Sequence, residues 1–165
     1  MIKMKKEKMN NKGFSLVELI IVIAIMAILI VVLAPQYLKY VEKSRNSTDL
    51  QNATEMVTAI QIYAADPEAA KPFVKAATFS IKISATGGAI TADTAAGSVA
   101  DALTEAGITI ADIKCSSKTK WTDYIISGKV EDSGAITFTY SATNAGEGTA
   151  FSDAMKGSAT TTTNP

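Results

Sequence analysis

Three residues near the start of the chain are unusual for a plain membrane anchor. Gly13 has no side chain, so an extended backbone at this point can lie close against another protein at the membrane face. The bulky aromatic Phe14 follows it directly. Glu18 comes four residues later, inside an otherwise apolar run, where a carboxylate costs a few kcal/mol unless it is paired or protonated. Glu18 is therefore a candidate functional residue; the alternative is an acid that simply snorkels to the interface.

The apolar run around Glu18 has the length of a membrane span. From Leu16 to Ala34 there are 19 residues, and only Glu18 among them is polar. As a helix they would span about 28 Å, close to the hydrocarbon thickness of a bilayer. The run predicts a transmembrane helix, because lipid obliges a backbone to satisfy its own hydrogen bonds.

Charge on either side of this run predicts its orientation. Five lysines precede it within the first twelve residues, whereas the residues after it mix Lys39, Lys43 and Arg45 with acids. The positive-inside rule then places the N-terminus in the cytoplasm and the bulk of the chain outside. A cleaved secretory signal peptide is a poor alternative. The apolar region of a signal peptide is shorter than this run, and Pro35 directly after Ala34 makes a poor cleavage site. An uncleaved anchor explains the length and orientation, but not Gly13-Phe14 or Glu18.

The pattern resembles the processing and assembly signal of type IV prepilins, and among these it is most like that of the type IVa group. Pseudopilins share the same signal. The resemblance covers residues 1 to about 40: a basic leader ending in Gly13, then Phe14, then Glu18, and Pro35 at the position where the family helix kinks. It implies cleavage between Gly13 and Phe14, N-methylation of Phe14, and pairing of Glu18 with the N-terminal ammonium of a neighbouring subunit. Pro35 predicts a kink; the alternative is that it ends the membrane helix.

The same resemblance implies a structural protein that forms a helical homo-oligomer. Its partners would be a prepilin peptidase that is also the N-methyltransferase, a cytoplasmic assembly ATPase and a membrane platform protein. The chain would lie in the cytoplasmic membrane as a single-pass protein, then in an extracellular pilus that serves adhesion, motility or surface association. A pseudopilin of a type II secretion or competence system is the nearest alternative. An anchored extracellular domain that never polymerises is the other.

Composition argues against several other functions. Histidine is absent, which removes the commonest general base and metal ligand and excludes Ser-His-Asp or Cys-His catalysis, but not carboxylate or lysine chemistry. No phosphate-binding loop follows Gly87-Gly88, so no ATPase is expected. With the resemblance to a structural protein, we expect neither an enzyme nor a cofactor. Without the leader, 11 basic residues face 15 acidic ones, which argues against nucleic-acid binding. The lone Cys115 is expected to be a buried small side chain. Five acids of the C-terminal third could include calcium ligands, as in some pseudopilins; they are Asp123, Glu131, Asp132, Glu147 and Asp153. They show no EF-hand spacing, so no metal site is predicted.

After the apolar run the helical pattern continues to about Ala65, where Asp66-Pro67 breaks it. We expect an amphipathic helix whose apolar stripe packs on a sheet; the stripe consists of Val41, Ala53, Met56, Val57, Ile60 and Ala64.

The remaining residues predict a small β-rich domain. Strands are expected around 79–83, at 121–127 and at 135–140, with the last two as a hairpin. A turn is expected at Gly87-Gly88, a short helix from Asp93 to Ala106 and an extended segment from Ile108 to Ile113.

The predicted fold class is α+β: a long N-terminal helix packed on a three- or four-stranded antiparallel sheet, the pilin fold. The predicted parts are a cleaved leader (1–13), a transmembrane and filament-core helix (14–35), its amphipathic continuation (36–65), a globular head (66–156) and a flexible tail (157–165).

Overall fold

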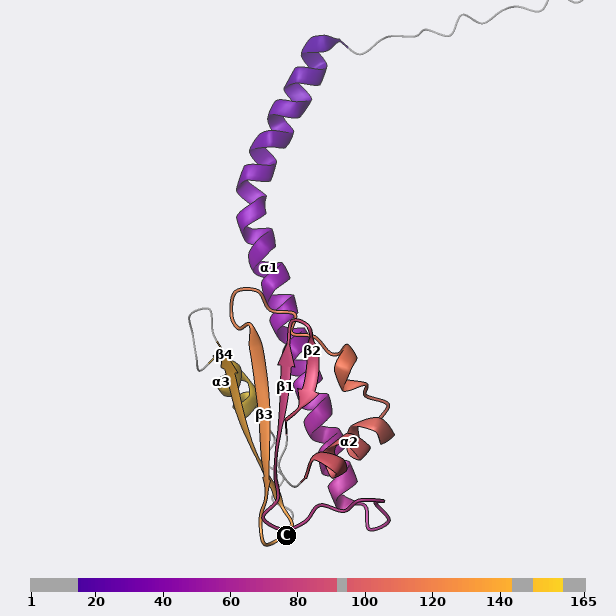
Figure 1. The fold of residues 1–165 in the computed structure, drawn as a ribbon. Coiled ribbons are helices and arrows are strands. Elements are labelled where there is room, and N and C mark those ends of the chain that lie inside the picture. The colour runs from indigo at the N-terminus through magenta and orange to yellow at the C-terminus, as the bar shows by residue number, and fades with distance from the viewer. Residues whose placement is uncertain (1–14, 92–94, 144–149, 159–165) are drawn as a thin grey trace, which may run out of the picture. The chain divides into compact units, whose positions relative to one another are not determined.

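The protein is described here by a computed structural model, which covers residues 15–91, 95–143 and 150–158. In chain order its elements are α1 (Leu16–Ala65), β1 (Thr78–Ser84), β2 (Gly87–Ile90), α2 (Ala96–Glu105), the short 3₁₀ helix η1 (Ile110–Asp112), β3 (Asp123–Val130), β4 (Ile136–Thr143) and α3 (Ala150–Ser158) (Figure 1). The chain forms two compact units that meet between Tyr40 and Val41, and α1 contributes to both. We call the part of α1 up to Tyr40 the apolar segment, and the unit from Val41 onward the head.

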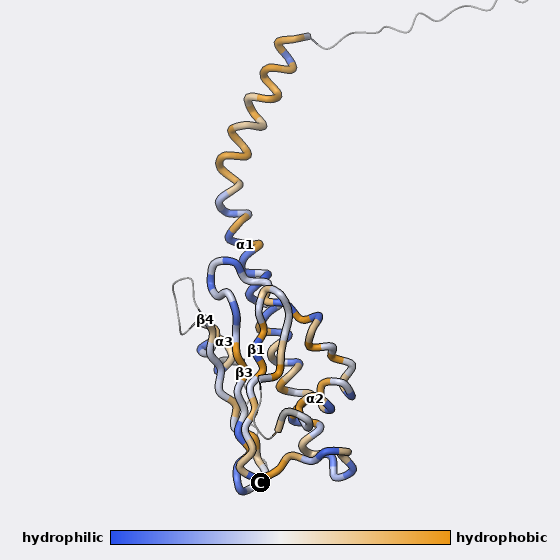
Figure 2. Tube along the Cα trace, viewed as in Figure 1, coloured by the Kyte–Doolittle hydropathy of each residue, from blue (hydrophilic) through white to orange (hydrophobic). Residues whose placement is uncertain are grey.

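The apolar segment exposes every one of its side chains. The large apolar side chains between Leu16 and Leu33 have exposed fractions from 48% at Val22 to 73% at Leu16, and Figure 2 shows this stretch as almost continuously hydrophobic. Among the described residues, α1 is the one helix long and apolar enough to cross a membrane. A surface of this kind is stable only against lipid or other apolar helices.

In the head, α1 becomes amphipathic and buries one face. The buried positions recur every three or four residues, as a helix requires; they are Asp49, Ala53, Met56, Val57, Ala59, Ile60 and Tyr63. Ala53, Met56, Val57 and Ile60 of the predicted stripe are confirmed as core, whereas Ala64 is exposed. Tyr63 takes the place expected for Ala64: its ring packs edge-on against Phe73, and its hydroxyl accepts the backbone N–H of Lys71.

Hydroxyl side chains on this part of α1 bond to the helix itself. Ser47, Thr48, Thr54 and Thr58 each donate to the carbonyl oxygen four residues earlier, at 2.8 to 3.1 Å. These bonds satisfy the hydroxyl groups without any partner from another element.

The head contains one antiparallel sheet of four strands in the order β2-β1-β3-β4. Side chains alternate across it, so that Phe79, Ile81 and Ile83 of β1 and Tyr124 and Ile126 of β3 join the core with α1. The opposite face of the sheet carries mostly serine and threonine. The predicted fold class is therefore confirmed: a long helix packs on a four-stranded antiparallel sheet.

Two short helices complete the core. α2 buries Val99, Ala102 and Leu103. α3 lies beside β4 (Figure 1) and buries Phe151, whose ring stacks on Tyr124 at 4.7 Å and meets Trp121 edge-on at 5.2 Å. No helix was predicted at α3, because its sequence is short, contains Gly157 and lies next to a low-complexity tail.

Three local predictions differ from the structure. The turn between β1 and β2 is made by Ala85 and Thr86, and Gly87-Gly88 begin β2 instead of forming the turn. Residues 110–112 form η1 instead of the expected extended segment, because Asp112 and Ile113 donate to carbonyls three residues earlier. α2 begins at Ala96, inside the predicted helix, and residues 92–94 lie outside the described part of the chain.

Gly128 is a constituent of β3, where the sequence suggested a boundary. It is paired with Phe79 in the register, and the Phe79 ring fills the space that a side chain at 128 would occupy: a Cβ there would collide with Cζ of Phe79. Phe79 is held in turn by Phe73 and Phe138, each with its ring centroid 6.0 Å away.

Candidate functional site at the start of the long helix

The sequence nominated four residues along the N-terminal segment. Gly13 and Phe14 lie outside the described residues, so the predicted cleavage and methylation positions stay predictions. Glu18 and Pro35 both lie on α1. The helix is continuous through Pro35, which shows that this proline does not end it. A kink at Pro35 stays a prediction.

Glu18 lies in the first turn of α1 and closes the end of the helix. The backbone N–H of Ser15, which immediately precedes the helix, donates to Oε2 of Glu18 at 2.9 Å. This is the glutamate half of a capping box, and it satisfies one of the amide donors that a helix start leaves open. A carboxylate in the first turn also interacts favourably with the helix dipole. Sequence reasoning missed this role, although Ser15-Leu16-Val17-Glu18 carries the capping-box spacing.

Glu18 is nevertheless surrounded by apolar side chains. Its side chain is exposed, and so are the neighbouring Leu19 at 59% and Ile21 at 52%. In lipid or in a bundle of such helices, a carboxylate with only one amide donor remains costly to bury. Glu18 can therefore both cap its own helix and seek a cation from outside it.

Two further carboxylates on α1, Asp49 and Glu42, bind a loop of the head. Asp49 is fully buried and accepts hydrogen bonds from the backbone N–H of Ser116 at 2.7 Å and of Ser117 at 2.9 Å. The indole Nε1–H of Trp121 donates to it at 2.8 Å, and the thiol of Cys115 at 3.5 Å. A buried charge is tolerated when several donors surround it in this way.

Glu42, seven residues earlier, holds the same loop. Its Oε1 accepts the backbone N–H groups of Lys118 at 2.7 Å and Thr119 at 2.9 Å, and the hydroxyl of Ser117 at 2.8 Å. Burial alone would raise the pKa of Glu42, but these hydrogen bonds outweigh it and lower the pKa to about 2. We call residues 113–122, which join η1 to β3, the clamped loop. No local pattern in the sequence indicated this contact, which joins residues 75 to 77 positions apart.

The clamp accounts for Cys115. The cysteine is buried, as predicted, and burial together with the nearby charge of Asp49 raises the pKa of its thiol to about 12. Burial also raises the pKa of Tyr124, again with Asp49 nearby. Neither group is an ionised nucleophile at neutral pH.

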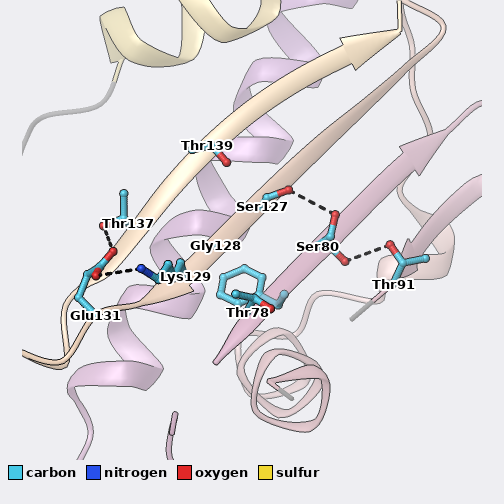
Figure 3. A pocket seen from close by; sticks show the side chains of 10 residues that line it. Thr78, Ser80, Thr91, Ser127, Gly128, Lys129, Glu131, Thr137 and Thr139 are labelled. Carbon is cyan, nitrogen blue, oxygen red and sulfur yellow. Dashed lines mark hydrogen bonds and ion pairs between the residues drawn. The ribbon is translucent and has the colours of Figure 1, made fainter. Parts of the chain in front are cut away.

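The outer face of the sheet carries a shallow hollow of about 760 Å³. Figure 3 shows hydroxyl groups along it, with Ser80 and Ser127 3.4 Å apart and Lys129 paired with Glu131 at 3.4 Å. Thr137 donates to the same glutamate at 3.2 Å. Ser80 and Ser127 bond to each other, and Lys129 and Thr137 bond to Glu131. The residues drawn form no nucleophile–base arrangement.

Those acids of the C-terminal third that the structure describes form no metal-binding cluster. Within residues 15–91, 95–143 and 150–158, no three acidic or cysteine side chains gather as a metal site would require. Asp123 instead pairs with Lys82 at 3.1 Å, and Glu147 lies outside the described residues.

Comparison with known proteins gives two kinds of match. Residues 8–34 match the family model described as the prokaryotic N-terminal methylation motif. The chain is also similar to type IV major fimbrial proteins FimA of Dichelobacter nodosus. One is 37% identical over 49% of this chain and 52% of its own length, and another is 40% identical over 41% of this chain and 44% of its own. No solved structure gives a significant match.

These matches cover the chain only in part, since it spans about half the length of the curated relatives it matches. They nevertheless agree with the α+β fold and with the capped, apolar start of α1. Pilin family proteins are structural and non-enzymatic. The methylation motif and the distant similarity to type IV major fimbrial proteins both point to the type IV pilins.

Proposed function

We propose that this chain is the subunit of a type IV pilus. It is inserted in the cytoplasmic membrane with its N-terminus inside, cut between Gly13 and Phe14, and polymerised into an extracellular filament. The single observation that carries the proposal is the apolar segment, whose side chains are all exposed and which contains one acid, Glu18. Such a surface suits lipid first and a bundle of identical helices afterwards.

Glu18 gives this bundle its register. Cleavage would free the amine of Phe14, and methylation would keep it cationic. In a core without water, the carboxylate of Glu18 and the amine of a neighbouring copy would each be costly alone, so only the register that pairs them is accessible. The capping bond to Ser15 uses Oε2, and a second acceptor, Oε1, belongs to the same carboxylate. The contribution is mainly to specificity.

The chain would depend on other proteins for the remaining steps. A prepilin peptidase would cut and methylate it, and a cytoplasmic ATPase with a membrane platform would supply the work of extraction. Adhesion and motility would then be properties of the filament. The fimbrial relatives favour a pilus; a pseudopilin of a type II secretion or competence system shares the same N-terminus, and a neighbouring retraction ATPase gene would distinguish the pilus.

Two substitutions at Glu18 separate its two roles. Glu18→Gln keeps an oxygen acceptor for the Ser15 amide but removes the negative charge, whereas Glu18→Ala removes both. If the charge sets the register, both variants reach the membrane but form few or no filaments in electron micrographs. Ser15→Ala keeps the backbone donor and the charge, so it is the matched control and should form filaments.

Normal filaments from Glu18→Gln would overturn the pairing mechanism and leave only the capping role. Mass spectrometry of the same wild-type material tests the processing step. We expect a mature chain that begins with N-methylated Phe14; filament protein that retains Met1 would contradict cleavage.

A further inference from the structure

Basic residues of the head are concentrated around the clamp. The first turns of α1 in the head (41–49) and the clamped loop contain five of the ten basic residues found after Tyr40, but only two of the fourteen acidic ones. The rest of the head has five basic residues against twelve acidic ones. We call the five the basic collar: Lys43, Arg45, Lys114, Lys118 and Lys120.

The two segments are held together by the clamp itself. The backbone N–H of Lys118 donates to Glu42, which is next to Lys43 in the sequence. Figure 1 shows the loop between η1 and β3 beside the first turns of α1 in the head, and Figure 2 shows hydrophilic residues there. Lys43, Arg45 and Lys118 are all exposed.

The two acids of this region face inward. Glu42 accepts three donors from the clamped loop and lies 3.6 Å from Arg45, while Asp49 is fully buried. Their carboxylate oxygens are therefore engaged within the protein, whereas Lys43 and Lys118 are exposed. The surface at this end of the head is cationic, although the head as a whole is acidic.

The chain tethers this surface close to any membrane that holds the apolar segment. Lys43 follows Ala34, the last residue of the apolar run, by nine residues. Nine residues span about 14 Å as helix, and about 6 Å of that distance lies within the headgroup layer of the bilayer. The screening length at physiological salt is about 8 Å, so a charged bilayer surface acts on the collar.

We propose that, before polymerisation, the basic collar binds anionic phospholipid headgroups of the bilayer in which the apolar segment is inserted. This inference rests on the membrane insertion contained in the proposed function. The contact holds the head against the membrane surface, and it must be broken when the subunit leaves the bilayer. Each basic residue near such a surface is worth about fivefold in the ratio of bound to unbound heads.

Proteoliposomes of the full-length chain test this. Trp121 is the only tryptophan and lies in the clamped loop, so energy transfer from it to dansyl-labelled headgroups reports how close the loop is to the lipid surface. We expect more transfer in vesicles that mix phosphatidylcholine with the anionic lipid phosphatidylglycerol than in vesicles of phosphatidylcholine alone. The increase should disappear in high salt.

Charge-matched variants localise the effect. Lys43→Gln/Lys118→Gln should lose most of the increase, because about fivefold per residue gives about 25-fold in the bound ratio. Lys75→Gln/Lys156→Gln removes the same charge from exposed positions elsewhere in the head and should keep it. Both doubles leave Arg45 beside Glu42, so the clamp is retained, and the Trp121 emission maximum verifies that the loop is folded.

The outcomes are distinct. If the chain inserts into both kinds of vesicle and energy transfer is equal in the two, the binding of the collar to anionic lipid is overturned, whereas membrane insertion stands. Failure to float with either would overturn membrane insertion, and this inference with it. Transfer that rises with protein density and not with anionic lipid would assign the collar to the acidic surface of a second copy, which also overturns the lipid contact.

Discussion

At the scale of single residues, carboxylates on α1 do three different jobs. Glu18 caps the helix among exposed apolar side chains. Glu42 accepts hydrogen bonds from backbone amides of the clamped loop, and Asp49 is buried under the same loop. The sequence identified only the first, because an acid in an apolar run is conspicuous by itself. Glu42 and Asp49 occur among ordinary polar residues, and nothing local indicates that a loop about 70 positions away will fold over them.

The pKa of Glu42 makes the clamp sensitive to acid. Because the folded-state pKa is about 2 and the ordinary value is 4.5, the stabilising contribution is complete above about pH 5 and is lost as pH falls from 4.5 towards 2. We expect the urea midpoint of the wild type to exceed that of Glu42→Gln at pH 7. The difference should shrink between pH 4.5 and pH 2.5, followed by Trp121 fluorescence.

Asp132→Asn, at an exposed turn position, is the control for this measurement and should follow the wild type at every pH. A gap between wild type and Glu42→Gln that stays constant down to pH 2.5 would show that the carboxylate is not held in its ionised form.

At the scale of elements, regular patterns predicted well and irregular ones did not. The alternation around Phe79 and the hairpin of β3 and β4 were confirmed because a period of two survives any tertiary context. The prediction for residues 110–112 was wrong and the helix at 150–158 was not predicted, because the conformation of such short segments depends on the core that they cover. Phe151 of α3 is an example, since its place is fixed by Tyr124 and Trp121.

Gly128 gives a prediction at this scale. A methyl group at 128 would collide with the ring of Phe79, and that ring cannot move freely between Phe73 and Phe138. We expect Gly128→Ala to lower the free energy of unfolding by about 1–3 kcal/mol, as overpacking of a core does. Urea titration in detergent measures it.

Phe79→Leu supplies the matching test, because a smaller side chain at 79 makes room for the methyl group. The double variant should lose less stability than the sum of the two single variants. A strictly additive double variant would contradict the collision.

At the scale of the whole molecule, the division at Tyr40 and Val41 separates two kinds of surface. All buried apolar residues of the core lie at Ala53 or later, whereas the apolar segment contributes none. The sequence foresaw the membrane-length helix and the sheet that it joins. It could not foresee the boundary between the units, because the same helix crosses it without a break.

A chain that begins at Tyr37 should therefore fold in water without detergent. Its core is complete, and the uninterrupted apolar run is gone. Circular dichroism and a cooperative urea transition in Trp121 fluorescence would verify this, with the chain from Phe14 onward aggregating in the same buffer. A fragment without a cooperative transition would show that the head needs the apolar segment for stability.

The hydroxyls of Ser47, Thr48, Thr54 and Thr58 have one more consequence. Each hydroxyl already donates to a carbonyl oxygen of α1 itself. Burying this part of α1 therefore leaves no hydroxyl donor without an acceptor. In the filament proposed above, neighbouring subunits would be free to cover these hydroxyls with either apolar or polar groups. Contacts on this part of α1 would thus need no hydroxyl partner from a neighbouring subunit.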